Sequence, residues 1–379
     1  MSKLDALIKD TNQKFKANIV HVGLVEKDIE RIPFSSSRAS YMLYGGVPTV
    51  GVVEFFGGEG GGKTTSALDI VANAQIMYKE AYDATIEELT EELEKAKKDK
   101  DKKKIQDKID ATVERKVFYV DTEMTLDTEW AKKLGVDIDK LVLMQPEAQT
   151  AEQVLQLIMD YIETGEIGMV VLDSIPCLVP QQIFEESMEK KAYGGVSGAL
   201  SVFSAKISPV LKKNECLLIG INQIREDLNS MYSTFSTPGG KAWKHACSLR
   251  LRFKKGKLLD ENNKELSARA ENPRGNVVEM EIIKTKVCKP DRRVGSYTLN
   301  YNIGVDTIYD LLFTMIDYGM VDGKGWYTFL DDEGNPMLDK DGEVRKYQGK
   351  NGVANALEED SEFFAECWER VQAKLSKVN

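Results

Sequence analysis

Four short apolar runs stand out between residues 50 and 225, and a small or polar residue follows each of them at once. The runs cover residues 52–56, 117–120, 169–172 and 217–221. Each run is too short for a typical helix, and strands that are apolar nearly throughout are typical of a sheet buried on both faces. The pattern predicts an α/β fold whose mostly parallel sheet is covered by helices on both sides.

The first run leads directly into a candidate phosphate-binding loop. Residues 57–65 read GGEGGGKTT and fit the pattern GxxxxGK[ST], and a helix-like run follows them. Glycines let consecutive backbone N–H groups face a phosphate chain, and the helix beginning near Lys63 adds its positive end. We expect Lys63 to reach the β- and γ-phosphates and Thr64 to bind Mg²⁺. The predicted nucleotide contacts of the loop are Gly57, Glu59, Gly60, Gly61, Gly62, Lys63, Thr64 and Thr65.

The other three strand ends supply carboxylate and amide groups, and ligands of parallel sheets bind beyond these ends. Asp173 follows its strand as a carboxylate suited to the Mg²⁺ shell. Glu123, two residues past its strand, is placed to polarise an attacking water, and the amide of Gln223 can bond the γ-phosphate. A residue of this kind at the end of a strand is more often a structural cap than a catalytic group. Their order behind a phosphate loop predicts a nucleotide hydrolase.

Composition and charge narrow the class of protein. A net charge of −10 argues against a protein that coats duplex DNA by bulk electrostatics, although residues 239–257 hold seven Lys or Arg and no acid. That segment is either a solvated cationic edge strand or a functional surface.

Five scattered cysteines favour neither a disulfide framework nor a zinc site, and they indicate a reducing cytoplasm. No apolar run approaches the length of a membrane span, and the N-terminus is not typical of a signal peptide.

Four stretches, in this order along the chain, resemble signatures of the bacterial RecA family of recombinases. They are residues 57–65, 133–139 (KLGVDID), 221–225 (INQIR) and 239–244 (GGKAWK). The resemblance covers most of the chain and suggests a phage-encoded member. It implies an ATPase that uses ATP and Mg²⁺, forms a helical filament on single-stranded DNA, and pairs that strand with homologous duplex DNA. Single-strand-binding and mediator proteins are further partners implied by the resemblance.

The resemblance also implies roles for residues around the nucleotide. By this likeness Glu123 activates water, Asp127 and Trp130 hold the adenine, and Tyr301 lies beside the base. Trp130 stands where the family usually has a tyrosine, and an indole stacks equally well.

A second group of residues resembles contacts made across the boundary between subunits. Lys284 and Lys286 resemble lysines that reach the γ-phosphate held by the neighbouring subunit, and Lys244 and Arg250 resemble the basic residues beside them. Without the resemblance, Lys284 and Lys286 would be read as exposed lysines alternating on a strand. His245 stands where the family has an aromatic that relays the nucleotide state.

Two segments, residues 185–197 and 225–243, resemble the DNA-binding loops of the family. Binding of single strands without sequence preference needs backbone amides and cations for phosphates, and apolar or aromatic side chains for base faces. Both kinds of group occur here, and a partner-docking loop is the alternative. The implied DNA contacts are Tyr193, Gly194, Arg225, Leu228, Tyr232, Gly239, Gly240 and Lys241.

The resemblance divides the chain into three parts. Residues 1–38 form an oligomerisation helix and a strand over residues 17–22, which includes Ile19 and pairs onto the next subunit; residues 39–306 form the ATPase core. Residues 307–379 form a small α+β domain, the part that receives duplex DNA in the family. The patterns there predict a helix over 307–320, a hairpin over 326–347 with a polar turn near 331–335, and a helix over 354–375.

Residues 79–116 have no counterpart in the resemblance. They are rich first in glutamate and then in lysine, and no glycine or proline interrupts them. An antiparallel helical hairpin whose acidic arm faces its basic arm is one interpretation, and a partly disordered charged loop is the other.

Two other functions fit parts of the pattern. A ring-forming replicative helicase shares the core fold but brings a different amino-terminal domain and an arginine finger, neither of which is apparent. A non-catalytic mediator that uses ATP only to switch its DNA affinity has little need of the carboxylate of Glu123. The function predicted from the sequence is therefore DNA-dependent ATP hydrolysis coupled to strand exchange.

Overall fold

The computed structural model describes residues 2–16, 20–23, 29–185, 195–226, 235–261 and 263–376. It divides into two units, Met1–Glu30 and Arg31–Asn379, each of which is described by itself. The first unit contains helix α1 (Lys3–Phe15), which begins at a capping box formed by Ser2 and Asp5 and has no buried residue. Of the strand predicted over 17–22, residues 17–19 with Ile19 lie outside the described residues. Residues 20–22 are not in a strand in the single chain, and their pairing onto a next subunit stays a prediction.

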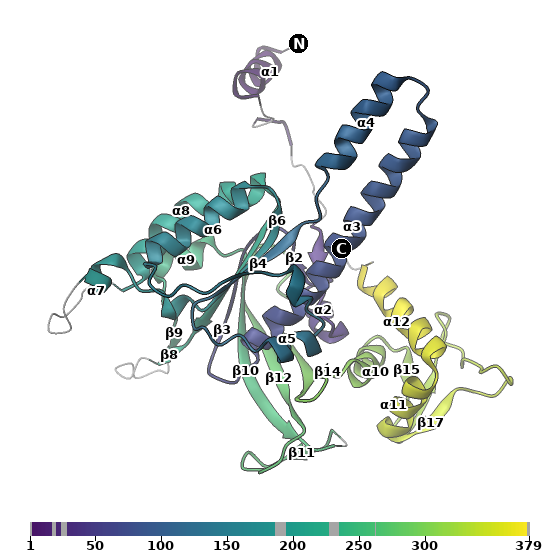
Figure 1. Cartoon of the computed structure of the whole chain (residues 1–379). Helices are drawn as coiled ribbons and strands as arrows, with labels where there is room; N and C mark the ends of the chain where they lie inside the picture. Colours follow the sequence, from purple (N-terminus) through teal and green to yellow (C-terminus); the bar gives the residue numbers. More distant parts are fainter. Residues whose placement is uncertain are drawn as a thin grey trace. The chain divides into compact units, whose positions relative to one another are not determined.

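The second unit is built around a twisted sheet whose order is β14-β13-β12-β10-β3-β7-β6-β4-β5, with β11 paired to β10 (Figure 1). From β10 to β5 neighbouring strands are parallel, and from β10 to β14 they are antiparallel. The strands are β3 (Gly51–Gly57), β4 (Lys116–Asp121), β5 (Val142–Met144), β6 (Ile167–Asp173), β7 (Leu217–Gln223), β10 (Leu249–Leu259), β11 (Glu265–Leu266), β12 (Gly275–Thr285), β13 (Val294–Asn300) and β14 (Gly304–Val305). The four apolar runs are thus four neighbouring parallel strands, which confirms the predicted fold class.

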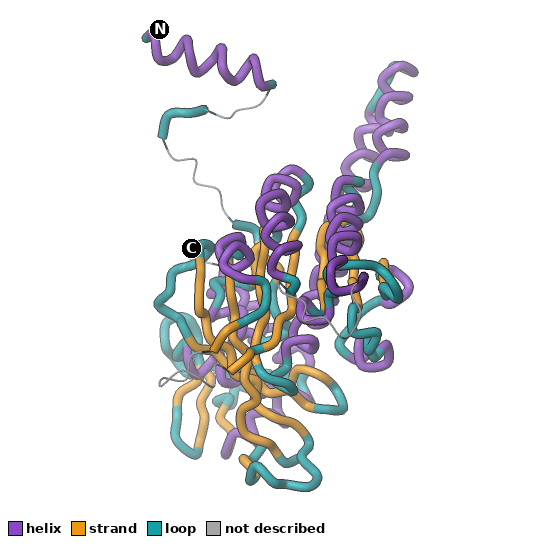
Figure 2. Tube along the Cα trace, turned by 90° about the vertical axis from the view of Figure 1, so that its left-hand side faces the viewer, coloured by secondary structure: helices purple, strands orange, loops and turns teal. Residues whose placement is uncertain are grey.

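Helices cover both faces of the sheet, as the orange strands between purple helices in Figure 2 show. Helices α3 and α5 pack with one apolar cluster, and α6, α8 and α9 pack with the other. The sheet is therefore buried on both faces, which explains the unbroken apolar runs. The helices around the sheet are α2 (Ser37–Met42), α3 (Lys63–Lys95), α5 (Thr128–Lys133), α6 (Ala151–Glu163), α7 (Gln181–Glu185), α8 (Ser197–Lys213) and α9 (Gly240–Ala246). Two small ribbons complete the unit, β1 (Arg31–Ile32) with β2 (Val47–Pro48) and β8 (Arg225–Glu226) with β9 (Phe235–Ser236).

The basic segment over residues 239–257 is not an edge strand. Its first part is α9, and its second part lies in β10, which pairs with β3 on one side and β12 on the other. β10 is therefore an interior strand and the place where the parallel and antiparallel halves of the sheet meet.

The insertion is a helical hairpin, as one interpretation of the sequence predicted. Helix α3 runs without a break from the phosphate loop to Lys95, and α4 (Asp99–Ala111) returns beside it. The last fully buried residue of α3 is Tyr78. Among the described residues no ion pair joins the two arms, because the pairs Lys79–Asp83 and Lys95–Glu91 both lie within α3. The two arms therefore lie against each other without an ion pair between them in the described part of the chain.

Replacing residues 81–112 with a short Gly/Ser linker should leave folding, ATP hydrolysis and single-strand binding close to the values of the parent chain. The hairpin contributes no fully buried residue, and shortening a loop carries little entropic penalty. The replacement stops before Glu114 and Arg115, because Glu114 pairs with Lys140 at 2.7 Å and Arg115 bonds the carbonyl of Asn214. Solubility, thermal unfolding and DNA-stimulated ATPase are the measurements. An insoluble or ATPase-dead product would show that the arms support the core.

The C-terminal part has an apolar core of its own, formed by α10 (Thr307–Asp317), a three-stranded sheet and two further helices. The sheet pairs β15 (Val321–Asp322), β16 (Trp326–Phe329) and β17 (Lys346–Gln348), so the predicted hairpin is present. The single helix predicted over 354–375 is wrong, because α11 (Gly349–Glu359) ends before α12 (Ser361–Ser376) begins. Asp360 breaks the helix: its Oδ1 accepts a hydrogen bond from the N–H of Phe363, as an N-cap does. The proposed boundaries at residues 38 and 306 stay predictions.

A buried carboxyl group joins α10 to α2. Asp310 accepts hydrogen bonds from the Ser36 hydroxyl (2.7 Å) and the Arg38 N–H (3.1 Å), and burial raises its pKa to about 7. Burial likewise raises the pKa of Asp69 on α3 to about 6. In both cases the folded state holds a proton that the unfolded chain releases near pH 4.

The free energy of unfolding should therefore fall as the pH rises from about 4 to 7, since over this range the unfolded state binds fewer protons than the folded state. Asp310→Asn removes one of the two titrating groups and should make the decline shallower above pH 5. Urea unfolding midpoints measured at half-unit pH steps test this expectation. Equal slopes for the parent chain and the variant would contradict it.

Within the described ranges, no helix combines the length and the apolar character needed to cross a membrane.

Candidate nucleotide site and nucleic-acid interface

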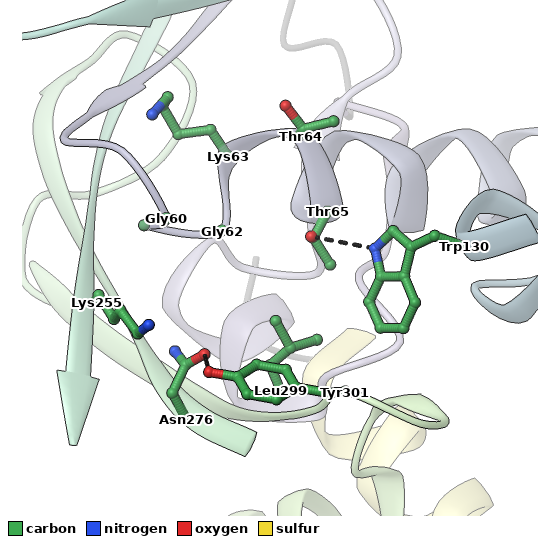
Figure 3. A pocket seen from close by; sticks show the side chains of 11 residues that line it. Gly60, Gly62, Lys63, Thr64, Thr65, Trp130, Lys255, Asn276, Leu299 and Tyr301 are labelled. Carbon is green, nitrogen blue, oxygen red and sulfur yellow. Dashed lines mark hydrogen bonds between the residues drawn. The ribbon is translucent and has the colours of Figure 1, made fainter. Parts of the chain in front are cut away.

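The loop between β3 and α3 forms one wall of a pocket of about 410 Å³ (Figure 3). Gly60 and Gly62 have φ angles of 65° and 90°, in the left-handed region that glycine tolerates. A side chain on Gly57 would place its Cβ 2.1 Å from the Phe253 carbonyl oxygen, so close packing on β10 also requires glycine there. The pocket is lined by Gly60, Gly61, Gly62, Lys63, Thr64, Thr65, Trp130, Lys255, Asn276, Leu299 and Tyr301.

The ammonium group of Lys63 is folded back onto its own loop. Its Nζ donates to the carbonyl oxygens of Gly58 (2.7 Å) and Gly57 (3.2 Å). Burial lowers the pKa of Lys63, and the nearby carboxylates of Asp173, Glu123 and Glu59 oppose that shift. Loop carbonyls are weak partners for a cation compared with a phosphate oxygen. The lysine is thus placed to exchange them for a phosphate.

Thr64, in the first turn of α3, and Asp173, at the end of β6, come together beside the phosphate loop. The Thr64 hydroxyl donates to Asp173 Oδ2 at 2.9 Å, and the Tyr119 hydroxyl donates to the same oxygen at 2.8 Å. Burial raises the pKa of Asp173, so a cation beside it would stabilise the charged form. Over the described part of the chain no three His, Cys, Asp or Glu side chains are grouped as metal ligands. The oxygen pair fits Mg²⁺, which typically takes one or two protein ligands and completes its shell with phosphate and water.

Glu123 lies on the loop after β4 with its carboxylate held at one oxygen. Oε1 accepts a hydrogen bond from the Ser174 hydroxyl at 2.5 Å, and the Cys177 thiol lies 3.7 Å from the same oxygen. Gln223 ends β7 in register with Gly57 of β3. The structure therefore brings the predicted strand-end residues to one edge of the sheet.

Two aromatic side chains line the pocket, as predicted for the base. The Trp130 Nε1 lies 3.4 Å from the Thr65 hydroxyl, and the Tyr301 hydroxyl donates to Asn276 Oδ1 at 2.9 Å. Asp127 does not line the pocket; it caps α5 by accepting a hydrogen bond from the N–H of Trp130 (2.9 Å). Its contact with the adenine stays a prediction.

Sequence reasoning missed three lining residues. Lys255, Asn276 and Leu299 reach the pocket from β10, β12 and β13, which are far from the phosphate loop in sequence. No local pattern marks them, because their place depends on the pairing of the antiparallel strands.

The lysines predicted to act across the subunit boundary gather at the end of α9, outside the lining of the chain's own pocket. Lys284 Nζ donates to the carbonyl oxygens of Lys244 (2.5 Å) and His245 (3.1 Å), and Lys286 Nζ donates to that of His245 (3.1 Å). Burial lowers the pKa of Lys284, and the nearby charge of Lys286 lowers it further. Carbonyls at a helix C-terminus favour cations, which explains why two ammonium groups share this place.

Arg250 points into the interior of its own chain. It pairs with Glu54 and lies over the ring of Phe56, with 8 % of its surface exposed. Asn222 and Trp243 also donate to Glu54, at 2.8 and 3.0 Å, so the buried carboxylate is fully bonded. The geometry gives Arg250 a structural role in its own chain, and its contact with a neighbouring subunit remains a prediction.

Four of the predicted DNA contacts, Tyr193, Gly194, Leu228 and Tyr232, lie outside the described residues. Arg225 lies in β8, whose backbone pairs with β9. Gly239 and Gly240 have φ angles of 102° and 70° and lead into α9, where Lys241 is exposed. The two glycines line a groove of about 520 Å³ together with Pro176, Leu178, Val179, Pro180, Ile183, Gly195, Val196, Ser197, Ser236, Thr237 and Pro238.

Comparison with known proteins agrees with this arrangement. The family model for the RecA N-terminal domain matches residues 104–306, more than half of the chain. Protein RecA of Thermotoga neapolitana is 29% identical over 379 aligned residues, which cover 98% of this chain and 93% of the relative. Protein RecA of Streptomyces coelicolor is 29% identical, with 98% and 85% covered, and that of Thermus aquaticus is 29% identical, with 99% and 95% covered. The chain therefore belongs to the RecA family of DNA-dependent ATPases, which mediate homologous pairing and strand exchange.

Proposed function

We propose that the pocket beside Lys63 binds ATP with Mg²⁺ and that hydrolysis there controls a filament on single-stranded DNA. The observation that supports this best is the Thr64–Asp173 hydrogen bond of 2.9 Å at the end of a glycine loop. A hydroxyl and a carboxylate in this position are the usual protein ligands of the metal in phosphate-loop ATPases. The metal, when bound, would neutralise charge on the β- and γ-phosphates.

The chain's own groups divide the work of binding. Loop amides and Lys63 hold the phosphates, and Thr64 and Asp173 orient the metal. Trp130 and Tyr301 enclose the base, since both line the same pocket. Excluding water from these groups strengthens every charge interaction among them.

Glu123 is the group proposed to orient the attacking water. One of its oxygens is bonded to Ser174, and Oε2 makes no hydrogen bond among the described residues. A carboxylate oxygen that makes no hydrogen bond to the protein can accept a proton from water. Gln223 bonds the γ-phosphate and begins the segment that leads to the second DNA loop, which links nucleotide state to DNA contact.

The lysine cluster at the end of α9 is proposed to complete the site of a neighbouring subunit. Lys284 and Lys286 are bonded only to carbonyls in the described structure, so each ammonium keeps donors for a phosphate. Cations supplied in trans stabilise charge that develops in the transition state. Filament growth and ATP hydrolysis are then coupled, because the site is complete only when two subunits are in contact.

Lys284→Ala or Lys286→Ala should lower DNA-stimulated ATP turnover by about 100-fold, the effect of removing one transition-state cation. Nucleotide affinity of the isolated subunit should stay within about twofold, since neither lysine lines its pocket. Fluorescent-nucleotide titration and DNA-stimulated turnover give the comparison, with Lys213→Ala on α8 as the exposed control. Equal losses of affinity and turnover would place these lysines in the subunit's own site.

The DNA surface is proposed to run along the groove that ends at Gly239 and Gly240, between the two predicted DNA loops. Duplex DNA, single-strand-binding proteins and mediators as further partners rest on family membership alone. The same holds for the bacterial cytoplasm as compartment. The phage origin is a proposal from the sequence resemblance alone, and the three relatives named above come from bacteria.

Electron microscopy with single-stranded DNA and a slowly hydrolysed ATP analogue tests the proposal as a whole. Open helical filaments are the expected result. Closed rings would favour a replicative helicase, and no assembly with nucleotide-dependent DNA binding would favour a mediator.

A further inference from the structure

The α3–α4 hairpin is held together by a narrow apolar seam. Tyr82, Ile86, Leu89 and Leu93 follow one another at spacings of four, three and four residues and are half-buried. Ile105 is half-buried on α4, and Figures 1 and 2 both show the two arms lying antiparallel. This spacing is typical of a two-stranded coiled coil, which fixes the charged residues on its outer faces.

Those charges are separated by sign along the hairpin. Residues 79–96 carry seven acidic and two basic side chains, whereas residues 97–104 carry six lysines and two aspartates. The six tip lysines form no ion pair within the described residues. Glu91, Glu92 and Glu94 stand close before Lys97, so the acidic arm adjoins the tip. Within the described residues no ion pair joins the tip lysines to this arm, so both sets of charges are available to a second molecule.

We propose that the hairpins of two copies of this chain lie side by side in opposite directions, with the lysine tip of each on the acidic arm of the other. A two-fold arrangement satisfies both pairs of surfaces at once. A nucleic acid fits less well, because phosphates held at the tip would lie against the acidic arm that adjoins it. The paired hairpins join filaments, or subunits before filament growth, through a contact separate from the ATPase core.

Charge exchange tests the pairing with the full-length chain. The tip variant changes Lys97, Lys98 and Lys100 to glutamate, and the arm variant changes Glu87, Glu88 and Glu92 to lysine. Each variant alone should lose lateral association of filaments, seen as at least a tenfold fall in light scattering and as unbundled filaments in electron micrographs. An equimolar mixture of the two should recover it, since an acidic hairpin then meets a basic one.

The matched control for the tip variant changes Lys206, Lys212 and Lys213 of α8 to glutamate, which alters the net charge by the same amount and sign and should leave association intact. ATP turnover of every variant reports whether the core is folded. Two results would overturn the proposal. Lateral association that survives in either variant would show the charges to be merely solvated. A tip variant that loses DNA affinity, with no recovery in the mixture, would assign the tip to nucleic acid.

A second inference concerns Ser174 and rests on the proposed role of Glu123. Ser174 is 1 % exposed, and its backbone is held by Thr122: the Ser174 N–H donates to the Thr122 hydroxyl (2.7 Å), which donates to the Ser174 carbonyl (2.8 Å). Its own hydroxyl donates to Glu123 Oε1 at 2.5 Å. A buried residue with a fixed backbone thus holds one oxygen of an exposed carboxylate.

We infer that Ser174 is a positioning residue, which keeps the Glu123 carboxylate in the orientation needed to hold water. Ser174→Ala should lower kcat by 10- to 100-fold and leave the Kd for nucleotide within about twofold. In a Glu123→Gln background the same change should have no further effect, because the carboxylate that it positions is gone. Ser201→Ala on the exposed face of α8 is the control.

The outcomes separate this inference from the proposal on which it rests. An unimpaired Glu123→Gln variant would overturn the role of Glu123 itself. If Glu123→Gln is inactive while Ser174→Ala turns over normally, only the positioning role fails. Weaker nucleotide binding by Ser174→Ala, in proportion to its loss of kcat, would make Ser174 a structural residue.

Discussion

Lys63→Ala is expected to abolish measurable ATP turnover and strand exchange. The ammonium group is the one lysine donor seated on the phosphate loop itself among the described residues, 2.7 Å from the Gly58 carbonyl. Removing one fixed donor that stabilises transition-state charge costs about 3–4 kcal/mol, or two to three orders of magnitude in rate. Loss of a full charge belongs at the upper end of that range, because hydrogen bonds from charged donors are stronger than those from neutral ones.

Lys255→Ala is the matched control, because it removes the same charge from the wall of the same pocket. Its effect should be much smaller, since Lys255 is exposed and reaches the pocket from β10 and not from the loop. Steady-state ATPase with saturating single-stranded DNA and nucleotide-binding titrations distinguish the two. Equal losses in both variants would mean that the pocket needs positive charge but no particular lysine. ATP turnover at the wild-type rate in Lys63→Ala would contradict the assignment of residues 57–65 as a phosphate-binding loop.

The parallel half of the sheet was predictable because burial on both faces leaves a local mark. Strands such as β6 and β7 are buried almost throughout, so their sequences are apolar without alternation. The short polar segments that follow these strands then predicted that the nucleotide binds at the edge of the sheet where the strands end. Thr64 and Asp173 were paired from sequence in this way, although they are 109 residues apart.

The antiparallel half left no comparable mark. In β12, buried and partly exposed positions alternate, and its register with β10 contains irregularities. The far wall of the pocket, with Lys255, Asn276 and Leu299, depends on that register. A sequence can suggest that such strands exist, but the pairing that carries their side chains to the nucleotide is a property of the whole sheet.

Arg250 and the hairpin show a different limit. The family resemblance assigned Arg250 to the subunit boundary, which stays a prediction, but it did not indicate the pair that Arg250 forms with the buried carboxylate of Glu54. For the hairpin, the helices followed from an uninterrupted run of helix formers. The sequence did not show which way the charged side chains point. The apolar seam decides which side chains face one another, and the glutamates and lysines lie outside it.

Glu123→Gln is expected to separate binding from chemistry. The amide keeps the size of the carboxylate and an oxygen that can accept the Ser174 hydrogen bond, so nucleotide and DNA affinity should change little. It cannot take a proton from water, and a general base of this kind contributes about 10²- to 10⁴-fold to rate. Filaments formed with ATP should then persist as long as those formed with a slowly hydrolysed analogue.

Filament lifetime after dilution and release of inorganic phosphate, measured on the same sample, test this expectation. A variant that binds ATP and DNA normally, releases phosphate at least 100-fold more slowly and keeps its filaments fits the proposed role. Glu163→Gln at the end of α6 is the control, because Glu163 is an exposed carboxylate that does not line the pocket. Normal hydrolysis by Glu123→Gln would require another group to orient the water, and Gln223, which ends β7 at the same edge of the sheet, would be the next residue to replace.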